Sequence, residues 1–162
     1  METVSAYFGA ERAESIVFIV AALFALAGSA WCLFVLKQPF FSGLAISFSM
    51  IAVLQLIVGV TIYQRSPHDT ARVLQMIQSE PDRLQSEEVT RMQVVMRNFK
   101  IYLGVELALF ILSLLVLTMM NPGSLILGAA LGLAIQAGFT AVLDLIAMLR
   151  GGAYLNWLLL QS

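Results

Sequence analysis

Four long and nearly charge-free apolar stretches constrain this chain more than any other feature of its sequence. They cover residues 16–36, 43–63, 101–120 and 124–149. A helix of about 20 residues, rising about 1.5 Å per residue, crosses a hydrocarbon core about 30 Å thick. Inside a bilayer the backbone has no water to bond, so such segments are helical. The sequence therefore predicts an all-α integral membrane protein, a four-transmembrane-helix bundle forming one domain over residues 1–162.

The composition agrees with this prediction and excludes other classes of protein. Hydrophobic residues make up 60% of the chain and charged residues 12%, whereas soluble domains average about 45–50% and about 25%. Such hydrophobicity excludes intrinsic disorder, and a single cysteine, Cys32, excludes a disulfide scaffold. The net charge of −1 offers no basic face for nucleic acid.

The connections between the stretches predict how the helices are paired. Residues 37–42 and 121–123 form short connections, so the stretches on either side of each are antiparallel neighbours. The connection 64–100 is much longer and carries six of the nine basic residues. Ser66 and Pro67 are typical of a helix start, and Glu80-Pro81-Asp82 of a break. We expect a helical hairpin here, with its second arm beginning near Ser86 and continuing into the third stretch.

The basic residues predict the orientation of the chain in the membrane. Lys37 stands alone on one side, and the other eight share the side of the long connection: Arg12, Arg65, Arg72, Arg83, Arg91, Arg97, Lys100 and Arg150. The positive-inside rule then places both termini and the hairpin in the cytoplasm. Gly151-Gly152 is expected to end the fourth helix. The tail 150–162, with Tyr154 and Trp157, is expected to lie along the membrane interface.

Two carboxylates, Glu106 and Asp144, lie inside the apolar stretches. Glu106 follows Lys100 by six residues and Asp144 precedes Arg150 by six, so both should lie about 9 Å inward from a charge, at one depth. An ionisable group in a bilayer usually faces the bundle interior or a water-filled cavity. One interpretation is a polar site for a cation, a proton or a polar ligand, which Asn98 and Tyr102 join at helical spacing.

The alternative interpretation is that each carboxylate forms an ordinary interfacial salt bridge. The candidate bases are Arg65, Arg97, Lys100 and Arg150, whose long side chains reach toward the interface. These bases, together with Tyr63 and Tyr154, also suit an anionic-lipid headgroup site, a small-molecule pocket or a plain aromatic and basic belt.

Polar and small residues inside the stretches predict helix packing. Gln55 and Gln136 each suit an interhelical hydrogen bond with a neighbouring helix. Gly128, Gly132 and Gly138 indicate a close approach of the fourth helix to a neighbour, either within the chain or in a homo-oligomer.

The sequence offers no chemistry of catalysis. No phosphate-binding loop, metalloprotease motif or nucleophile elbow is present. His68 is the only histidine, which excludes a bis-histidine haem, and it lies on the opposite side from Cys32, so no zinc site forms. We therefore expect no enzyme, metal or cofactor.

Two functions fit these features. The first is a non-enzymatic accessory or interaction subunit that binds membrane lipids or a protein partner, the partner through the hairpin at 66–98. The alternative is a small oligomeric transporter or channel that uses Glu106 and Asp144 for a cation or proton. The short outer connections and scarce cysteine suit a bacterial inner membrane.

Overall fold

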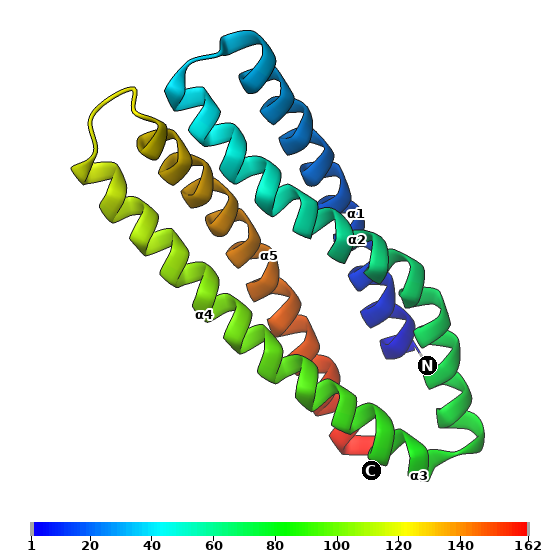
Figure 1. The fold of residues 1–162 in the computed structure, drawn as a ribbon. Helices are drawn as coiled ribbons and strands as arrows, with labels where there is room; N and C mark the ends of the chain where they lie inside the picture. Colours follow the sequence, from blue (N-terminus) through cyan, green and yellow to red (C-terminus); the bar gives the residue numbers. More distant parts are fainter. Residues whose placement is uncertain (1, 162) are drawn as a thin grey trace.

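Four long helices make up almost the whole chain. The computed structural model describes residues 2–161 (Figure 1). Along the chain it contains α1 (Glu2–Trp31), η1 (Cys32–Leu36), α2 (Pro39–Ser79), α3 (Pro81–Arg83), η2 (Leu84–Val89), α4 (Thr90–Met119) and α5 (Leu125–Gln161), of which η1 and η2 are π-helical. Four helical segments are long and apolar enough to cross a membrane, as the sequence predicts.

The helices lie side by side in the order α1, α2, α5, α4 (Figure 1). The main packing contacts are those of α1 with α2, α2 with α5, and α5 with α4, whereas the backbone of α4 does not come close to that of α1 or α2. Consequently, only 6% of the 18 most apolar consecutive residues of the α4 segment are buried, against 44% of those of the α5 segment. The apolar part is thus closer to a single layer of helices than to a closed bundle.

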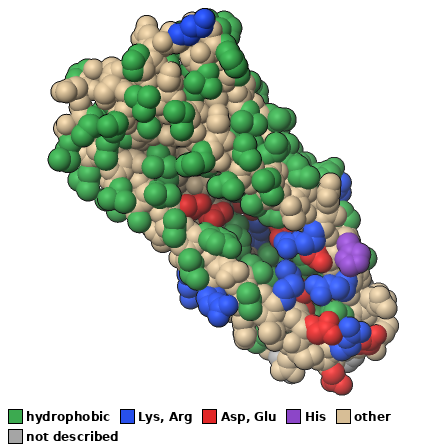
Figure 2. Space-filling model, in the orientation of Figure 1, with side chains coloured by type: hydrophobic (Ala, Val, Ile, Leu, Met, Phe, Trp, Pro, Cys, Tyr) green, Lys and Arg blue, Asp and Glu red, His purple; other side chains and the backbone are tan. Residues whose placement is uncertain are grey.

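The layer closes into a bundle only at the end that holds both termini, here called the polar end (residues 2–15, 64–100 and 150–161). Figure 2 shows the charged side chains gathered at this end and apolar side chains over the rest. Its core draws on all four long helices: Val4, Tyr7, Phe8, Val73, Met76, Leu84, Val89, Met92, Tyr154 and Leu158. The apolar residues of the hairpin are therefore buried against the two ends of the chain.

The predicted helix start at Ser66-Pro67 is wrong, because α2 runs without interruption from Pro39 to Ser79 with Pro67 inside it. The Ser66 hydroxyl caps no helix; it donates instead to the Phe8 carbonyl at 3.1 Å. This contact with α1 gives Ser66 a partner within a continuous helix. The break at Glu80 is confirmed, where φ is −145° and α2 ends.

The predicted helix end at Gly151-Gly152 is also wrong, because α5 continues to Gln161. A Cβ on Gly151 would lie 3.0 Å from the Met96 sulfur. The glycine thus allows α4 and α5 to pack closely and does not terminate the helix. The tail that was expected at the interface instead inserts Leu158, 1% exposed, into the core of the polar end.

Two further boundaries differ from the prediction. α1 begins at Glu2, before the apolar stretch, because Val4 and Phe8 face the core of the polar end. The second arm of the hairpin begins at Pro81 and not near Ser86, and it continues through η2 into α4 as expected.

Candidate functional site

The two carboxylates of the apolar stretches lie close enough to interact. Glu106 on α4 is electrostatically coupled to Asp144 on α5, and Asp144 to Glu14 on α1. Figure 2 shows acidic side chains beside a hollow, where the apolar surface meets the charged end. We call Glu14, Glu106 and Asp144 the acidic cluster. It lies where the layer of helices closes into a bundle.

The acidic cluster contains more acidic than basic side chains. Arg150 pairs with Glu14, and these side chains are 23% and 12% exposed. Within residues 2–161, no lysine or arginine forms an ion pair with Glu106 or Asp144. The one guanidinium at the cluster thus pairs with Glu14 alone, and ionisation of Glu106 and Asp144 would leave two negative charges without a counter-charge.

Polar side chains extend from the acidic cluster along one face of α5. Gln136, Thr140 and Asp144 follow one another at a spacing of four residues, which places them on one side of the helix. The Thr140 hydroxyl donates to the Gln136 and Ala137 carbonyls of its own helix, at 3.0 and 3.2 Å. Across from α5, the Glu106 carboxylate of α4 has its Oε2 buried without a hydrogen-bond partner. At the far end, Gln55 Nε2 donates to Gln136 Oε1 at 3.1 Å. This polar track joins α2, α4 and α5.

Beyond Gln55 and Gln136, small residues bring α2 and α5 together. A Cβ on Gly128 would collide with the Phe40 carbonyl, and a Cβ on Gly132 would lie 3.0 Å from the Leu44 carbonyl oxygen. The Ser47 hydroxyl donates to the Ala129 carbonyl at 2.7 Å. These glycines serve packing within the chain, and backbone contact closes the α2–α5 interface in this half. Gly138, farther along α5, faces the Phe110 ring of α4.

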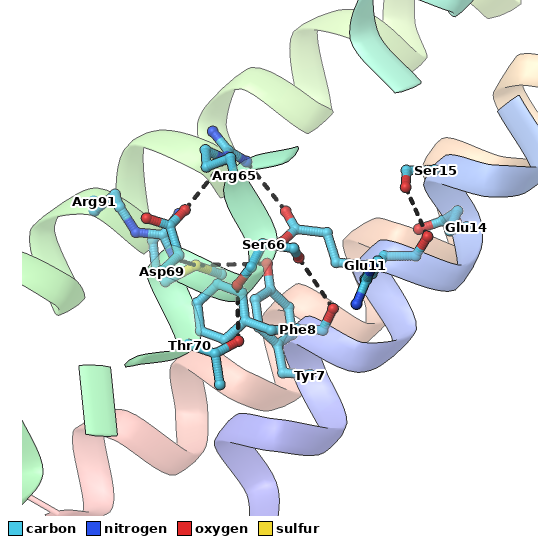
Figure 3. A network of polar contacts seen from close by, with 12 residues as sticks. Tyr7, Phe8, Glu11, Glu14, Ser15, Arg65, Ser66, Asp69, Thr70 and Arg91 are labelled. Carbon is cyan, nitrogen blue, oxygen red and sulfur yellow. Dashed lines mark hydrogen bonds and ion pairs between the residues drawn. The ribbon is translucent and has the colours of Figure 1, made fainter. Parts of the chain in front are cut away.

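At the polar end, ion pairs connect α1 to α2. Arg65 reaches Glu11 of α1 and Asp69 of its own helix, both at 3.2 Å (Figure 3). Ser66 lies between them and also reaches Glu11 Oε2, at 3.3 Å. Arg65, predicted as a partner for the intramembrane carboxylates, is therefore held by other acids.

A second and fully buried network surrounds Glu88, which is 0% exposed. Its carboxylate accepts hydrogen bonds from Arg72 at 3.2 Å, from Arg91 at 2.6 and 2.8 Å, and from the Tyr154 hydroxyl at 3.3 Å. Burial lowers the pKa of Arg91, but the hydrogen bonds and the charge of Glu88 outweigh it and raise that pKa overall. Glu88 thus ties α2, α4 and α5 together.

Two tyrosines are stacked beside this network. The rings of Tyr7 and Tyr154 lie 4.2 Å apart at an angle of 8°, and the Tyr7 hydroxyl points to the Met92 sulfur at 3.7 Å. Burial, followed by the charge of Glu11, raises the pKa of Tyr7 to about 12. Burial, followed by the charge of Glu88, likewise raises the pKa of Tyr154. Tyr154, expected at a lipid interface, is a core residue with an exposure of 2%.

The remaining predicted site residues are dispersed. Tyr63 accepts a hydrogen bond from Arg12 at 2.8 Å, with the guanidinium over its ring. Tyr102 is 54% exposed, and Asn98 is half-buried one turn before it. Arg97 and Lys100 are exposed, and they form no ion pair with the described residues.

Sequence reasoning missed Glu14, Thr140 and Glu88. The spacing of four between Gln136, Thr140 and Asp144 could have identified Thr140. Glu14 and Glu88 had no comparable signal, because acids at those positions are usually solvated. The inward position of Glu88 coincides with the π-helical turn η2, which sequence patterns do not indicate.

The described residues contain no group of three or more histidine, cysteine, aspartate or glutamate side chains arranged to hold a metal ion. The carboxylates of the acidic cluster are thus coupled through space and do not converge on one point. Comparison of the chain with protein-family models, curated proteins and solved structures finds no match.

Proposed function

We propose that this chain is a non-enzymatic integral membrane protein that binds a positively charged group at the acidic cluster. The observation that carries the proposal is the excess of acidic groups: Glu14 alone of the three carboxylates pairs with an arginine of residues 2–161, and one carboxylate oxygen of Glu106 is buried without a partner. Carboxylates near a bilayer are costly unless a cation, a proton or water compensates them.

The surroundings favour binding over conduction. The polar track reaches from the acidic cluster to Gln55 and Gln136, and beyond these residues α2 and α5 are in backbone contact at Gly128. A single chain in this conformation therefore gives a cation access from one side only. The transport alternative requires a second conformation, or an oligomer, that opens the far half.

A protein partner that docks on the hairpin would meet mainly polar side chains. Val73, Met76, Val89 and Met92 are buried by the two ends of the chain. An apolar face of the hairpin is thus not free to receive a partner, and docking there would use its polar surface.

The proposed orientation places the polar end in the cytoplasm of a bacterial cell, in its inner membrane. Eight of nine basic residues support it through the positive-inside rule. The acidic cluster would then open toward the cytoplasm. Arg97 and Lys100, both exposed, would lie near the headgroups of anionic lipids.

Calorimetric titration of the full chain in phosphatidylcholine nanodiscs tests the proposed function. The probes are spermidine, a polyamine with distributed positive charge, and sodium chloride. We expect saturable binding of at least one probe by the unmodified chain. Glu106→Gln and Asp144→Asn should each weaken it about tenfold or more, because each removes one charge from a low-dielectric site.

Asp82→Asn is the matched control. It removes one negative charge from an exposed position of the polar end, away from the acidic cluster. Binding that Asp82→Asn weakens as much as Asp144→Asn would show nonspecific attraction and would refute the proposal. The absence of saturable binding by either probe would refute it as well.

A further inference from the structure

A second hollow lies at the polar end, where α2 turns into α3. Its volume is about 360 Å³, and we call it the elbow groove; it is lined by His68, Ala71, Arg72, Gln75, Met76, Glu80 and Arg83. Small-molecule sites begin at about 300 Å³, so the groove has room for a small ligand. It contains no residue of the acidic cluster.

Hydrogen-bond donors outnumber acceptors among the side chains of the groove. Arg72 donates through Nη2 to Glu88 at 3.2 Å, and its Nε is buried without a hydrogen-bond partner. Arg83 donates through Nε to Glu87 at 2.8 Å and through Nη1 to Glu80 at 2.5 Å. Each guanidinium carries five N–H donors, so both keep donors in reserve. Gln75 and His68, the latter 82% exposed, add further polar groups at the rim.

The carboxylates around the groove act as supports for the two arginines. Asp69 and Glu88 flank Arg72, at 3.8 and 3.2 Å, and Glu80 and Glu87 hold Arg83. A guanidinium fixed in this way loses little rotational entropy when it binds a further acceptor. Glu80 is the only acid among the lining residues, and Arg83 already neutralises it.

We propose that the elbow groove binds the phosphate group of a small water-soluble molecule. Guanidinium groups match phosphate oxygens in geometry and charge, and Arg72 and Arg83 present two of them to one hollow. Ala71, which is exposed, provides a small apolar surface beside the two arginines, and Met76, 4% exposed, lies at the base of the groove. Arg72 follows the end of the apolar stretch at Tyr63 by nine residues, or about 13 Å of helix, whereas the headgroup layer extends only about 5–8 Å beyond the hydrocarbon core. That distance favours a soluble phosphate over a lipid headgroup.

Calorimetric titration of the full chain with pyrophosphate, in nanodiscs of phosphatidylcholine alone, tests this proposal. We expect saturable binding that His68→Asn and Arg83→Gln each weaken about tenfold or more, as expected for loss of a hydrogen bond to a charged group. Both positions lie at the exposed surface, so the fold should tolerate these changes. Arg97→Gln, which removes an exposed base elsewhere, is the matched control and should bind as the unmodified chain does.

Three outcomes would overturn the proposal. The first is the absence of saturable pyrophosphate binding, and the second is an equal loss of binding in Arg97→Gln. The third is binding of phosphate only as phosphatidic acid placed in the disc, which would identify a lipid and not a soluble ligand. Pyrophosphate binding is measured separately from spermidine binding, so either proposal can fail while the other stands.

Discussion

At the scale of single residues, Glu88 has the greatest influence on the polar end. A carboxylate with 0% exposure is stable only because two guanidinium groups and a tyrosine hydroxyl donate to it. Removing one partner of a buried ion pair leaves the other charges uncompensated, which costs about 3–5 kcal/mol. The helix that contributes Glu88 depends on this network for its position relative to α2 and α5.

We predict that Glu88→Gln lowers the free energy of unfolding of the detergent-solubilised protein by about 3 kcal/mol. Thermal unfolding followed by circular dichroism measures the change. Glu87→Gln, one residue earlier, is the control, because Glu87 is 42% exposed and pairs only with Arg83; it should change stability by less than about 1 kcal/mol. Equal effects of the two substitutions would show that the buried Glu88 network contributes no more to stability than the exposed Glu87–Arg83 pair.

Tyr7 gives the polar end a distinct response to alkaline pH. Its pKa in the folded chain is about 12, compared with an ordinary value of 10.0. Between these values the folded state retains a proton that the unfolded state loses, so stability is fully present below pH 10 and falls as pH rises toward 12. A shift of this size corresponds to about 2–3 kcal/mol.

We therefore predict that Tyr7→Phe flattens the fall in stability between about pH 10 and 12. Thermal unfolding at a series of pH values measures it. Tyr102→Phe, at an exposed position on α4, should leave the fall unchanged. A Tyr7→Phe variant with the same slope as the unmodified chain would contradict the prediction.

At the scale of helices, the α2–α5 contact depends on glycine. A Cβ on Gly128 would overlap the Phe40 carbonyl, a backbone atom that cannot move aside alone. Even alanine should therefore separate α2 from α5. By contrast, a Cβ on Gly104 of α4 would meet nothing within 4 Å.

We predict that Gly128→Ala lowers the free energy of unfolding by about 1–3 kcal/mol, the usual cost of overpacking. Gly104→Ala should be neutral or stabilising by up to about 1 kcal/mol, because alanine is the better helix former. Thermal unfolding of both variants in the same detergent provides the comparison. If Gly104→Ala were the more destabilising change, α4 would have a neighbour that the single chain does not show.

The helices themselves were predictable from the sequence, whereas several of their ends were not. The apolar stretches and the break at Glu80-Pro81 follow from hydrophobicity and turn chemistry. Pro67 and Gly151-Gly152 carry local signals for a start and an end, and tertiary contacts with Phe8 and Met96 override both. As polar residues inside apolar stretches, Gln55 and Gln136 were each expected to form an interhelical hydrogen bond, and the structure shows that they bond to each other. The contribution of Glu14 to the acidic cluster arises only from the contact of α1 with α5, where Arg150 pairs with Glu14.

At the scale of the whole molecule, charge is divided between two unlike ends. One end holds Lys37 in a short turn, where its φ of 52° is left-handed. The polar end holds both termini and the other eight basic residues. Moving that end across a bilayer would require transfer of the buried Glu88 network and the exposed bases together. The molecule is therefore expected to have one fixed orientation, with the polar end in the cytoplasm.

Cysteine labelling in intact bacterial cells tests this orientation. In a Cys32→Ser background, we predict that Gln38→Cys, in the α1–α2 turn, reacts with a membrane-impermeant maleimide. Gln85→Cys, at an exposed position of η2, should react only after the cells are permeabilised. The reverse pattern would invert the topology and turn the acidic cluster toward the outer face. Labelling of both sites in intact cells would mean that the chain has no fixed orientation, since eight bases against one would then fail to specify a side.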